Sequence, residues 1–188
     1  MRYSADHRRA ARARIVAAAA VLLRERGILQ PTVAAIMART GRTHGGFYHH
    51  FSSRDALIAA AVEGAARETA ARVFEEAGDA PTMLATYLSS AHVATPGEGC
   101  VLAAVGTEGV RSDARVIRRA FARAARGFIA HVDRVLARRP SSSAPAAPHA
   151  VSDEALVLAA RMVGAVVLAR LVRDAALADR ILASARQS

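Results

Sequence analysis

The chain has 188 residues, of which 53% are hydrophobic and 4% aromatic, and its 26 basic residues are all Arg, giving a net charge of +10. This length suffices for one large or two small domains, and the single cysteine, Cys100, excludes an intramolecular disulfide. Ala, Leu and Arg favour helices and no alternating β-branched run occurs, so we expect an all-α protein.

The positive charge is concentrated near the N-terminus. Residues 1–54 contain ten Arg but only two acidic residues, Asp6 and Glu25, whereas the remainder has a net charge of only +2. A basic N-terminal third joined to a nearly neutral remainder is typical of a protein that binds nucleic acid. A solvated basic arm without a partner is the alternative.

The first helix is expected over residues 6–26, ending at Gly27. Four apolar residues at helical spacing form its buried side; they are Ile15, Ala19, Leu22 and Leu23. The Arg-rich segment before them is of the kind that reaches phosphates or a minor groove. Residues 1–14 lack the apolar centre of a signal peptide, so we expect a cytoplasmic protein.

A short helix followed by a glycine turn comes next. Thr32 is suited to cap this helix, because its hydroxyl can accept a hydrogen bond from a backbone N–H of the first turn. Val33, Ile36 and Met37 recur at helical spacing and give the helix one apolar face. Gly41 then provides a residue for a left-handed turn.

A second helix is expected at about residues 44–50, with Thr43 as its cap. Phe47 and Phe51 lie four residues apart, so they share a face that can pack on the preceding helix. Tyr48 is left on the outer side. This is the pattern of a helix-turn-helix, whose second helix enters the major groove of DNA.

These motifs resemble the DNA-binding domain of the tetracycline-repressor (TetR) family over about residues 10–60. The matching residues are Thr32-Val33, Gly41, the run from Thr43 to Phe51, and Arg54-Asp55-Ala56-Leu57. Arg54 stands where the family usually has Lys, and Arg42 where it usually has a small apolar residue. The resemblance implies a three-helix helix-turn-helix domain over residues 1–54, a helical ligand-binding and dimerisation domain over residues 55–188, and about nine helices in all.

The resemblance also implies the DNA contacts, which come from the helix-turn-helix and its flanks. The residues are Thr32, Thr43, His44, Gly45, Gly46, Tyr48, His49, His50 and Arg54. Because Gly45 and Gly46 offer no side-chain hydrogen bonds, we expect sparse base readout with a contribution from DNA shape. We expect no metal and no cofactor, since His49 and His50 point about 100° apart on a helix and no acid or cysteine is near.

The rest of the chain is predicted to form six further helices. They cover about residues 53–77, 81–93, 100–110, 113–138, 152–173 and 174–186, with a Pro/Ser/Ala linker at 139–151. The helix at 53–77 has one apolar face, formed by Ile58, Val62, Ala65, Thr69 and Val73, and should connect the two parts. The many Arg residues of 113–138 lie off its apolar stripe and are interpreted as a solvated face.

The helix at 152–173 is apolar nearly all round. A membrane span is excluded because Arg161, Arg170 and Arg173 leave too short an apolar run. A helix that is apolar on every side must be covered on every side. We therefore expect a homodimer through the last two helices, as in the family, with a core wholly within one chain as the alternative.

A small-molecule pocket in the second part is implied by the resemblance. The candidates are non-aliphatic residues on inward faces, each with a plain core position as the alternative: Met83, Tyr87, His92, Cys100, Phe121, Phe128 and Met162. Scarce aromatics and balanced charge favour a mainly apolar effector. The sequence shows no recognisable set of a nucleophile, a general base and a group that orients the base, so we do not expect this protein to be an enzyme.

The sequence therefore predicts a DNA-binding transcriptional regulator. The expected mechanism is a repressor that binds a palindromic DNA operator as a dimer and is released by a small effector, with activation left open. The first alternative is a regulator that senses oxidants or electrophiles through Cys100, without a reversible ligand. The second is an enzyme on a helical scaffold.

Overall fold

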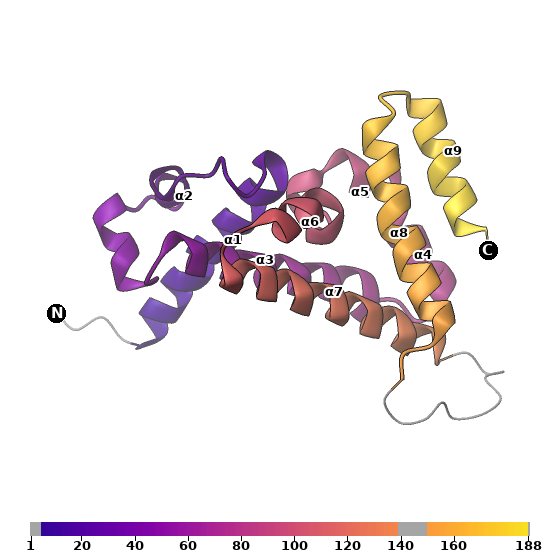
Figure 1. Ribbon diagram of the computed structural model, residues 1–188, viewed down its shortest axis with the longest axis horizontal. Coiled ribbons are helices and arrows are strands. Elements are labelled where there is room, and N and C mark those ends of the chain that lie inside the picture. The colour runs from indigo at the N-terminus through magenta and orange to yellow at the C-terminus, as the bar shows by residue number, and fades with distance from the viewer. Residues whose placement is uncertain (1–4, 139–149, 188) are drawn as a thin grey trace.

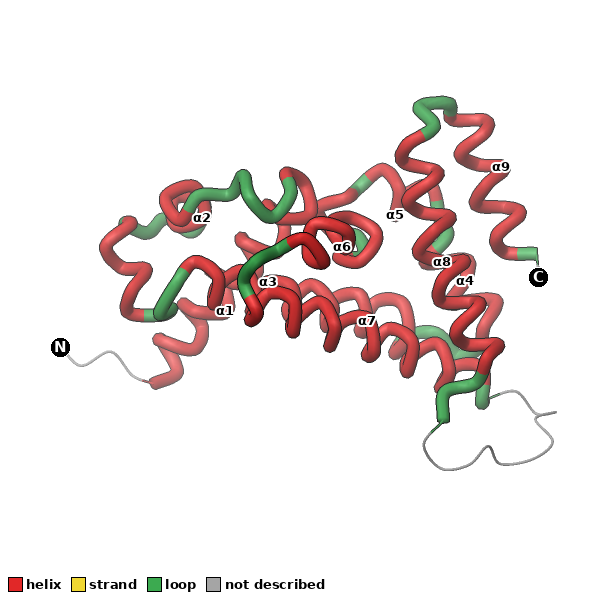
Figure 2. Tube along the Cα trace, in the orientation of Figure 1, coloured by secondary structure: helices red, strands yellow, loops and turns green. Residues whose placement is uncertain are grey.

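The computed structural model describes residues 5–138 and 150–187, and every regular element in this part of the chain is helical. Figure 2 shows helices joined by loops. The described residues contain nine α-helices. The predicted all-α fold is confirmed. Most of the predicted linker at 139–151 lies outside the described residues.

The N-terminal head consists of α1 (Ala5–Arg26), α2 (Val33–Arg39) and the short helix η1 (His44–His49). It occupies one end of an elongated molecule (Figure 1). Gly27 ends α1 as predicted, with a φ of +87° that favours glycine. The four residues predicted for the buried side of α1 are all buried.

The remaining elements follow the head in chain order. They are α3 (Arg54–Thr69), η2 (Ala70–Glu75), α4 (Ala80–Tyr87), α5 (Ser90–Ala94), η3 (Pro96–Glu98), α6 (Val101–Arg111), α7 (Arg115–Leu136), α8 (Asp153–Leu171) and α9 (Ala175–Arg186). Side chains cap α3, α4, α5, α8 and α9 by accepting a backbone N–H; the caps are Ser53, Asp79, Ser89, Ser152 and Asp174.

Helices α3 and α7 run side by side along the molecule, with α6 lying against them, while α8 and α9 form a hairpin at the end far from α2 (Figure 1). Two buried clusters result. The N-terminal core joins the head to α3, to the first half of α7, and to Val101 and Val105 of α6. The C-terminal core joins η2, α4, α8 and α9 to the second half of α7. The predicted domain boundary at residues 54 and 55 falls at the start of α3 and stays a prediction.

Three predicted helices differ from the structure. The helix expected at 81–93 is two helices, because Ser89 accepts a hydrogen bond from the backbone N–H of His92 and starts a new one. The helix expected at 53–77 becomes π-helical after Thr69. The helix expected at 44–50 is a 3-10 helix in which Thr43 makes no side-chain cap bond, consistent with the weak α-helix propensity of its two glycines.

Helix α6 is bent at Val105. Val105 departs from helical geometry, with φ −140° and ψ 17°. Gly109 is buried where α6 meets α7, and a Cβ at this position would overlap the ring of Phe121. The glycine therefore permits close packing of the two helices.

A buried histidine ties the C-terminal core together. The Nδ1 of His92 lies 2.5 Å from the carbonyl oxygen of Tyr87, and its Nε2 accepts a hydrogen bond of 2.9 Å from the backbone N–H of Cys100. Arg170 of α8 donates to the His92 carbonyl oxygen at 2.9 Å. Because Nε2 accepts and Nδ1 donates, the ring is satisfied in its neutral form. Burial lowers the pKa of His92 to about 4.

We expect the free energy of unfolding to decrease as the pH falls from about 6.5 towards 4. In this window the unfolded chain binds a proton at His92 that the folded chain excludes, which corresponds to about 3 kcal/mol at the lower end. Burial also lowers the pKa of His50 and His131, which act in the same direction. Urea denaturation across this window measures the effect.

His92→Gln should reduce the pH dependence, whereas His44→Gln, which changes an exposed histidine of η1, should retain it. An unchanged dependence in His92→Gln would contradict the assignment.

Candidate functional site

The first helix of the motif is built as predicted. The Thr32 hydroxyl accepts a hydrogen bond of 3.1 Å from the N–H of Ala35, which caps α2. Gly41 has a φ of +67°, the left-handed conformation expected of the turn. Ile36 and Met37 are fully buried, whereas Thr32 is exposed at the start of α2.

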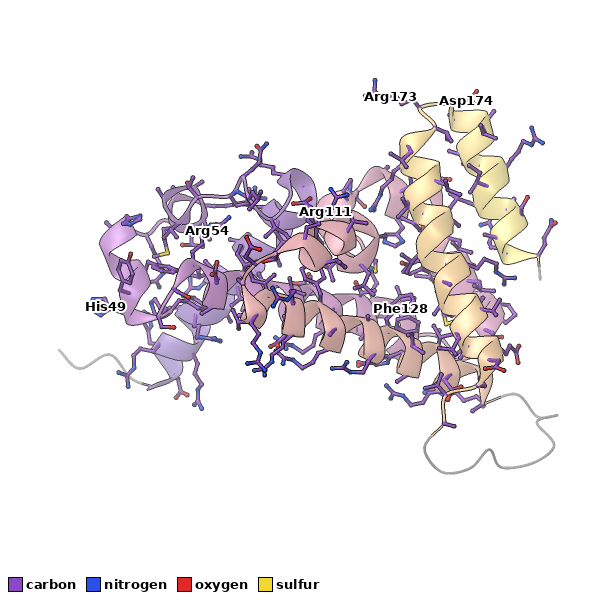
Figure 3. All side chains as sticks on the ribbon, viewed as in Figure 1. His49, Arg54, Arg111, Phe128, Arg173 and Asp174 are labelled. Atoms are coloured by element: carbon purple, nitrogen blue, oxygen red, sulfur yellow. The ribbon has the colours of Figure 1, made fainter. Side chains whose placement is uncertain are left out.

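The second helix of the motif turns one face inward and one outward. Phe47 and Phe51 are buried, and their rings stack with centroids 5.8 Å apart. Tyr48 is 69% exposed and sets its ring against the edge of Phe47, at 5.1 Å and 76°. The remaining outward residues are exposed or half-buried: His44, Gly45, Gly46, His49 and His50. His49 lies at the outer end of the head in Figure 3.

A basic cleft of about 790 Å³ lies between the start of α1 and this turn. Its lining includes Arg8, Arg42, Thr43, His49 and His50. Burial, followed by the charge of Arg42, lowers the pKa of His50, as expected in positive surroundings. Guanidinium groups and ring nitrogens around a cleft next to the exposed face of η1 are suited to a phosphate.

Arg54 lies at the start of α3 and points back into the loop between α1 and α2 (Figure 3). Its guanidinium donates to the carbonyl oxygens of Ile28, Leu29 and Pro31, the last two at 3.1 and 3.3 Å from Nη2. The phosphate contact predicted for Arg54 remains a prediction. In this structure the side chain braces the loop that leads into α2.

Glu108 of α6 holds the same loop through a backbone N–H. Its Oε2 accepts a hydrogen bond of 2.7 Å from the backbone N–H of Ile28. A Cβ at Gly27 would lie only 2.9 Å from both carboxylate oxygens, so the glycine also makes room for Glu108. We call residues 27–31, Arg54 and Glu108 the loop clamp. No local pattern in the sequence indicates this contact, because the two residues are 80 positions apart.

A second cavity, of about 330 Å³, lies between α3, η2, α6 and α7. Phe74 and Phe128 form an edge-to-face pair in its wall, with centroids 5.2 Å apart and an angle of 82°. The ring of His131 stacks on Phe74. The lining also contains Thr69 and Cys100, which are both buried, and the charged residues Glu63, Arg67 and Arg123. Figure 3 shows Phe128 on α7.

Two of the seven residues predicted to bind a ligand, Cys100 and Phe128, line this cavity. Three others belong to the C-terminal core, namely Met83, Tyr87 and Met162, and His92 is buried with its ring against Tyr87. Phe121 belongs to the N-terminal core beside Gly109. Sequence analysis missed Thr69, Phe74 and His131 as cavity residues, although Thr69 stood out as the one polar residue on the apolar face predicted for its helix.

The final hairpin presents large exposed apolar side chains. They are Leu156, Val157, Leu168, Leu171 and Leu177. None of the helices within residues 5–138 and 150–187 is long and apolar enough to cross a membrane. In the same residues, no group of three or more His, Cys, Asp or Glu side chains is arranged to hold a metal ion.

Comparison with known proteins agrees with this architecture. Residues 15–61 match the family described as "Bacterial regulatory proteins, tetR family". The chain is 30% identical over 168 residues to the uncharacterized HTH-type transcriptional regulator MT0206 of Mycobacterium tuberculosis (strain CDC 1551 / Oshkosh), and the match covers 87% of this chain and 86% of that one.

Two solved structures have a similar fold. The reduced form of E. coli NemR has a TM-score of 0.72 and 22% identity, and the similarity covers 94% of this chain and 95% of that one. A TetR-family regulator from Agrobacterium tumefaciens has a TM-score of 0.73 and 19% identity, covering 96% and 97%. The exposed helix-turn-helix, the all-helical fold and these matches together show that the chain belongs to the TetR family of transcriptional regulators.

Proposed function

We propose that this DNA-binding regulator is a dimeric repressor whose hold on a palindromic operator is released by a small molecule in the cavity between α3, η2, α6 and α7. The observation that carries the proposal is the position of α6. Val101 and Leu102 at its start line the cavity. Glu108 near its end accepts the hydrogen bond from Ile28 in the loop clamp. One helix thus joins a ligand-sized cavity to the head.

DNA contact by the head is supported by the two faces of η1. Phe47 fixes the inner face in the N-terminal core, so the outward residues are held in place on a packed support. The proposed DNA contacts are those of the sequence analysis, joined by Arg8 and Arg42 of the basic cleft. Phosphates would be bound by the arginines and Thr32, and base edges would be approached by η1.

Dimerisation is supported by the apolar side chains that α8 and α9 leave exposed. Val157 and Leu171 are each about two-thirds exposed, at 66% and 68%, although both belong to a helix that buries another of its faces in the C-terminal core. A second copy of the hairpin would cover them. Two heads can then bind one duplex when their separation matches the repeat of the major groove, about 34–36 Å.

Release would require the ligand to prefer a different arrangement of the heads. A ligand that displaces the first turn of α6 acts across the bend at Val105 on Glu108 at the other end. Since Glu108 holds Ile28 in the loop between α1 and α2, a shift of α6 would be transmitted to the helix-turn-helix.

Cys100 supports a second candidate, a regulator that responds to oxidants or electrophiles. Its side chain is only 2% exposed but lines the cavity, through which a small reagent has access. Loss of an oxidant response in Cys100→Ala, without loss of a ligand response, would favour this candidate.

We expect selective binding to the DNA upstream of the protein's own gene, measured by fluorescence anisotropy against a scrambled duplex. If each dimer neutralises about 6–10 phosphates, the affinity should fall by about 10³–10⁵ between about 50 and 200 mM salt. Tyr48→Ala should weaken binding by about tenfold or more, because a hydrogen bond to a charged phosphate is lost. Arg119→Gln, an exposed site on α7, is the control. Equal, weak binding to both duplexes would count against this operator.

We expect Glu108→Ala to loosen residues 27–31, because the Ile28 N–H loses a charged acceptor worth about 1–3 kcal/mol. Hydrogen exchange of this loop should accelerate, and a cavity ligand should no longer change DNA affinity. Asp113→Ala, a nearby exposed acid, is the matched control and should behave as wild type. Full ligand control of DNA binding in Glu108→Ala would rule out the loop clamp as the route.

A further inference from the structure

The lining of the cavity indicates which class of molecule it takes, an inference that rests on the proposed function and extends it. We propose that the effector is a small amphipathic carboxylate whose apolar body lies against Phe74 and Phe128 and whose carboxylate accepts the hydroxyl of Thr69. This differs from the mainly apolar effector that the composition suggests, because composition does not show which polar groups surround the cavity.

Thr69 presents an unused hydrogen-bonding group. It is 3% exposed and lines the cavity, and its Oγ1 has no hydrogen-bond partner. A threonine inside a helix commonly donates to a carbonyl oxygen three or four residues earlier, which would satisfy the hydroxyl. A buried hydroxyl without a partner is unfavourable, and an acceptor on a bound molecule removes that cost.

The backbone next to Thr69 is also unusual. Residues Ala70–Glu75 form the π-helical η2, and Ala70 and Phe74 of this segment line the cavity. Short π-helical segments within longer helices are frequent at functional sites. The change of helix type directly after Thr69 is therefore independent support for a binding site at this position.

Hydrogen-bond donors predominate among the polar side chains of the lining. The Nδ1 of His131 lies 2.9 Å from Nη2 of Arg134, and since a guanidinium can only donate, Nδ1 must accept. Burial lowers the pKa of His131, so the ring is neutral near pH 7 and carries its proton on Nε2. The one carboxylate among the lining residues, Glu63, is already paired with Arg123. A ligand in the cavity therefore meets mainly hydrogen-bond donors, which pair best with a ligand that carries hydrogen-bond acceptors.

The charge of the lining has the matching sign. Arg67 and Arg123 outnumber Glu63, and the guanidinium of Arg67 has no hydrogen-bond or ion-pair partner among the described residues. The resulting positive field favours an anion and disfavours a cation. The apolar wall, formed by Phe74, Phe128 and their aliphatic neighbours, suits a single ring or a short branched chain, and about 330 Å³ is at the small end of ligand cavities.

The test compares three probes with the same body and different head groups: phenylbutyrate, phenylbutanol and phenylbutylamine. Isothermal titration of the full-length protein should give an affinity for the acid at least about tenfold above those for the alcohol and the amine. Equal affinity for the three probes, tighter binding of the amine, or no binding of the acid at millimolar concentration would overturn the proposal.

Two variants locate the head group. Thr69→Val keeps the side-chain shape and should lower the affinity for the acid by about tenfold without lowering the unfolding temperature, because no native hydrogen bond is lost. Arg67→Gln should lower the affinity for the acid by about threefold, and by less at high salt. Arg126→Gln, on the exposed side of α7, should leave this affinity unchanged. Unchanged acid affinity in Thr69→Val, or an equal loss for all three probes, would refute the assigned role of Thr69.

The DNA assay separates this inference from the proposed function. If phenylbutyrate binds with the expected preference but leaves operator affinity unchanged, the carboxylate class of ligand is supported and the proposal that a ligand releases the DNA is contradicted. If the acid does not bind while another compound releases the DNA through the cavity, release stands and the carboxylate class is overturned.

Discussion

The loop that leads into the helix-turn-helix is held by contacts with residues that are far away in the sequence. The carboxylate of Glu108 accepts the N–H of Ile28, and Arg54 holds three carbonyl oxygens of the same loop. Because a carboxylate binds a backbone N–H of this loop and a guanidinium binds its carbonyl oxygens, the loop has little conformational freedom. The helix-turn-helix therefore takes its position from α3 and α6 as well as from α1.

The cores explain why movement at the cavity would reach the head. Val101 and Val105 of α6 are buried in the N-terminal core together with Phe47, whereas Cys100 belongs to the C-terminal core. Close-packed interiors transmit displacement because they contain few voids. The bend at Val105 lies between the end of α6 that lines the cavity and the end that bears Glu108. Because α6 is short and packs in both cores, it is suited to adopt two alternative positions between them.

Features with a local cause were predictable from the sequence. Gly27 and Gly41 end helices because glycine adopts positive φ readily, and Ser53 and Ser152 begin helices because their hydroxyls accept backbone N–H groups. Features that depend on distant partners were not. Periodicity identified Met83 and Met162 as buried, but it cannot distinguish a residue packed in a closed core from one that lines a cavity. The contact of Glu108 with Ile28 leaves no local pattern either.

The central claim, that the cavity controls the separation of two heads, is tested most directly by a distance measurement between them. Ala38 is exposed on α2, so a spin label attached to Ala38→Cys in a Cys100→Ala background would report on the heads alone. Pulsed electron resonance of the dimer on operator DNA should give one narrow distance, and filling the cavity should shift it to a different separation. Identical distance distributions with and without a bound ligand would contradict the account.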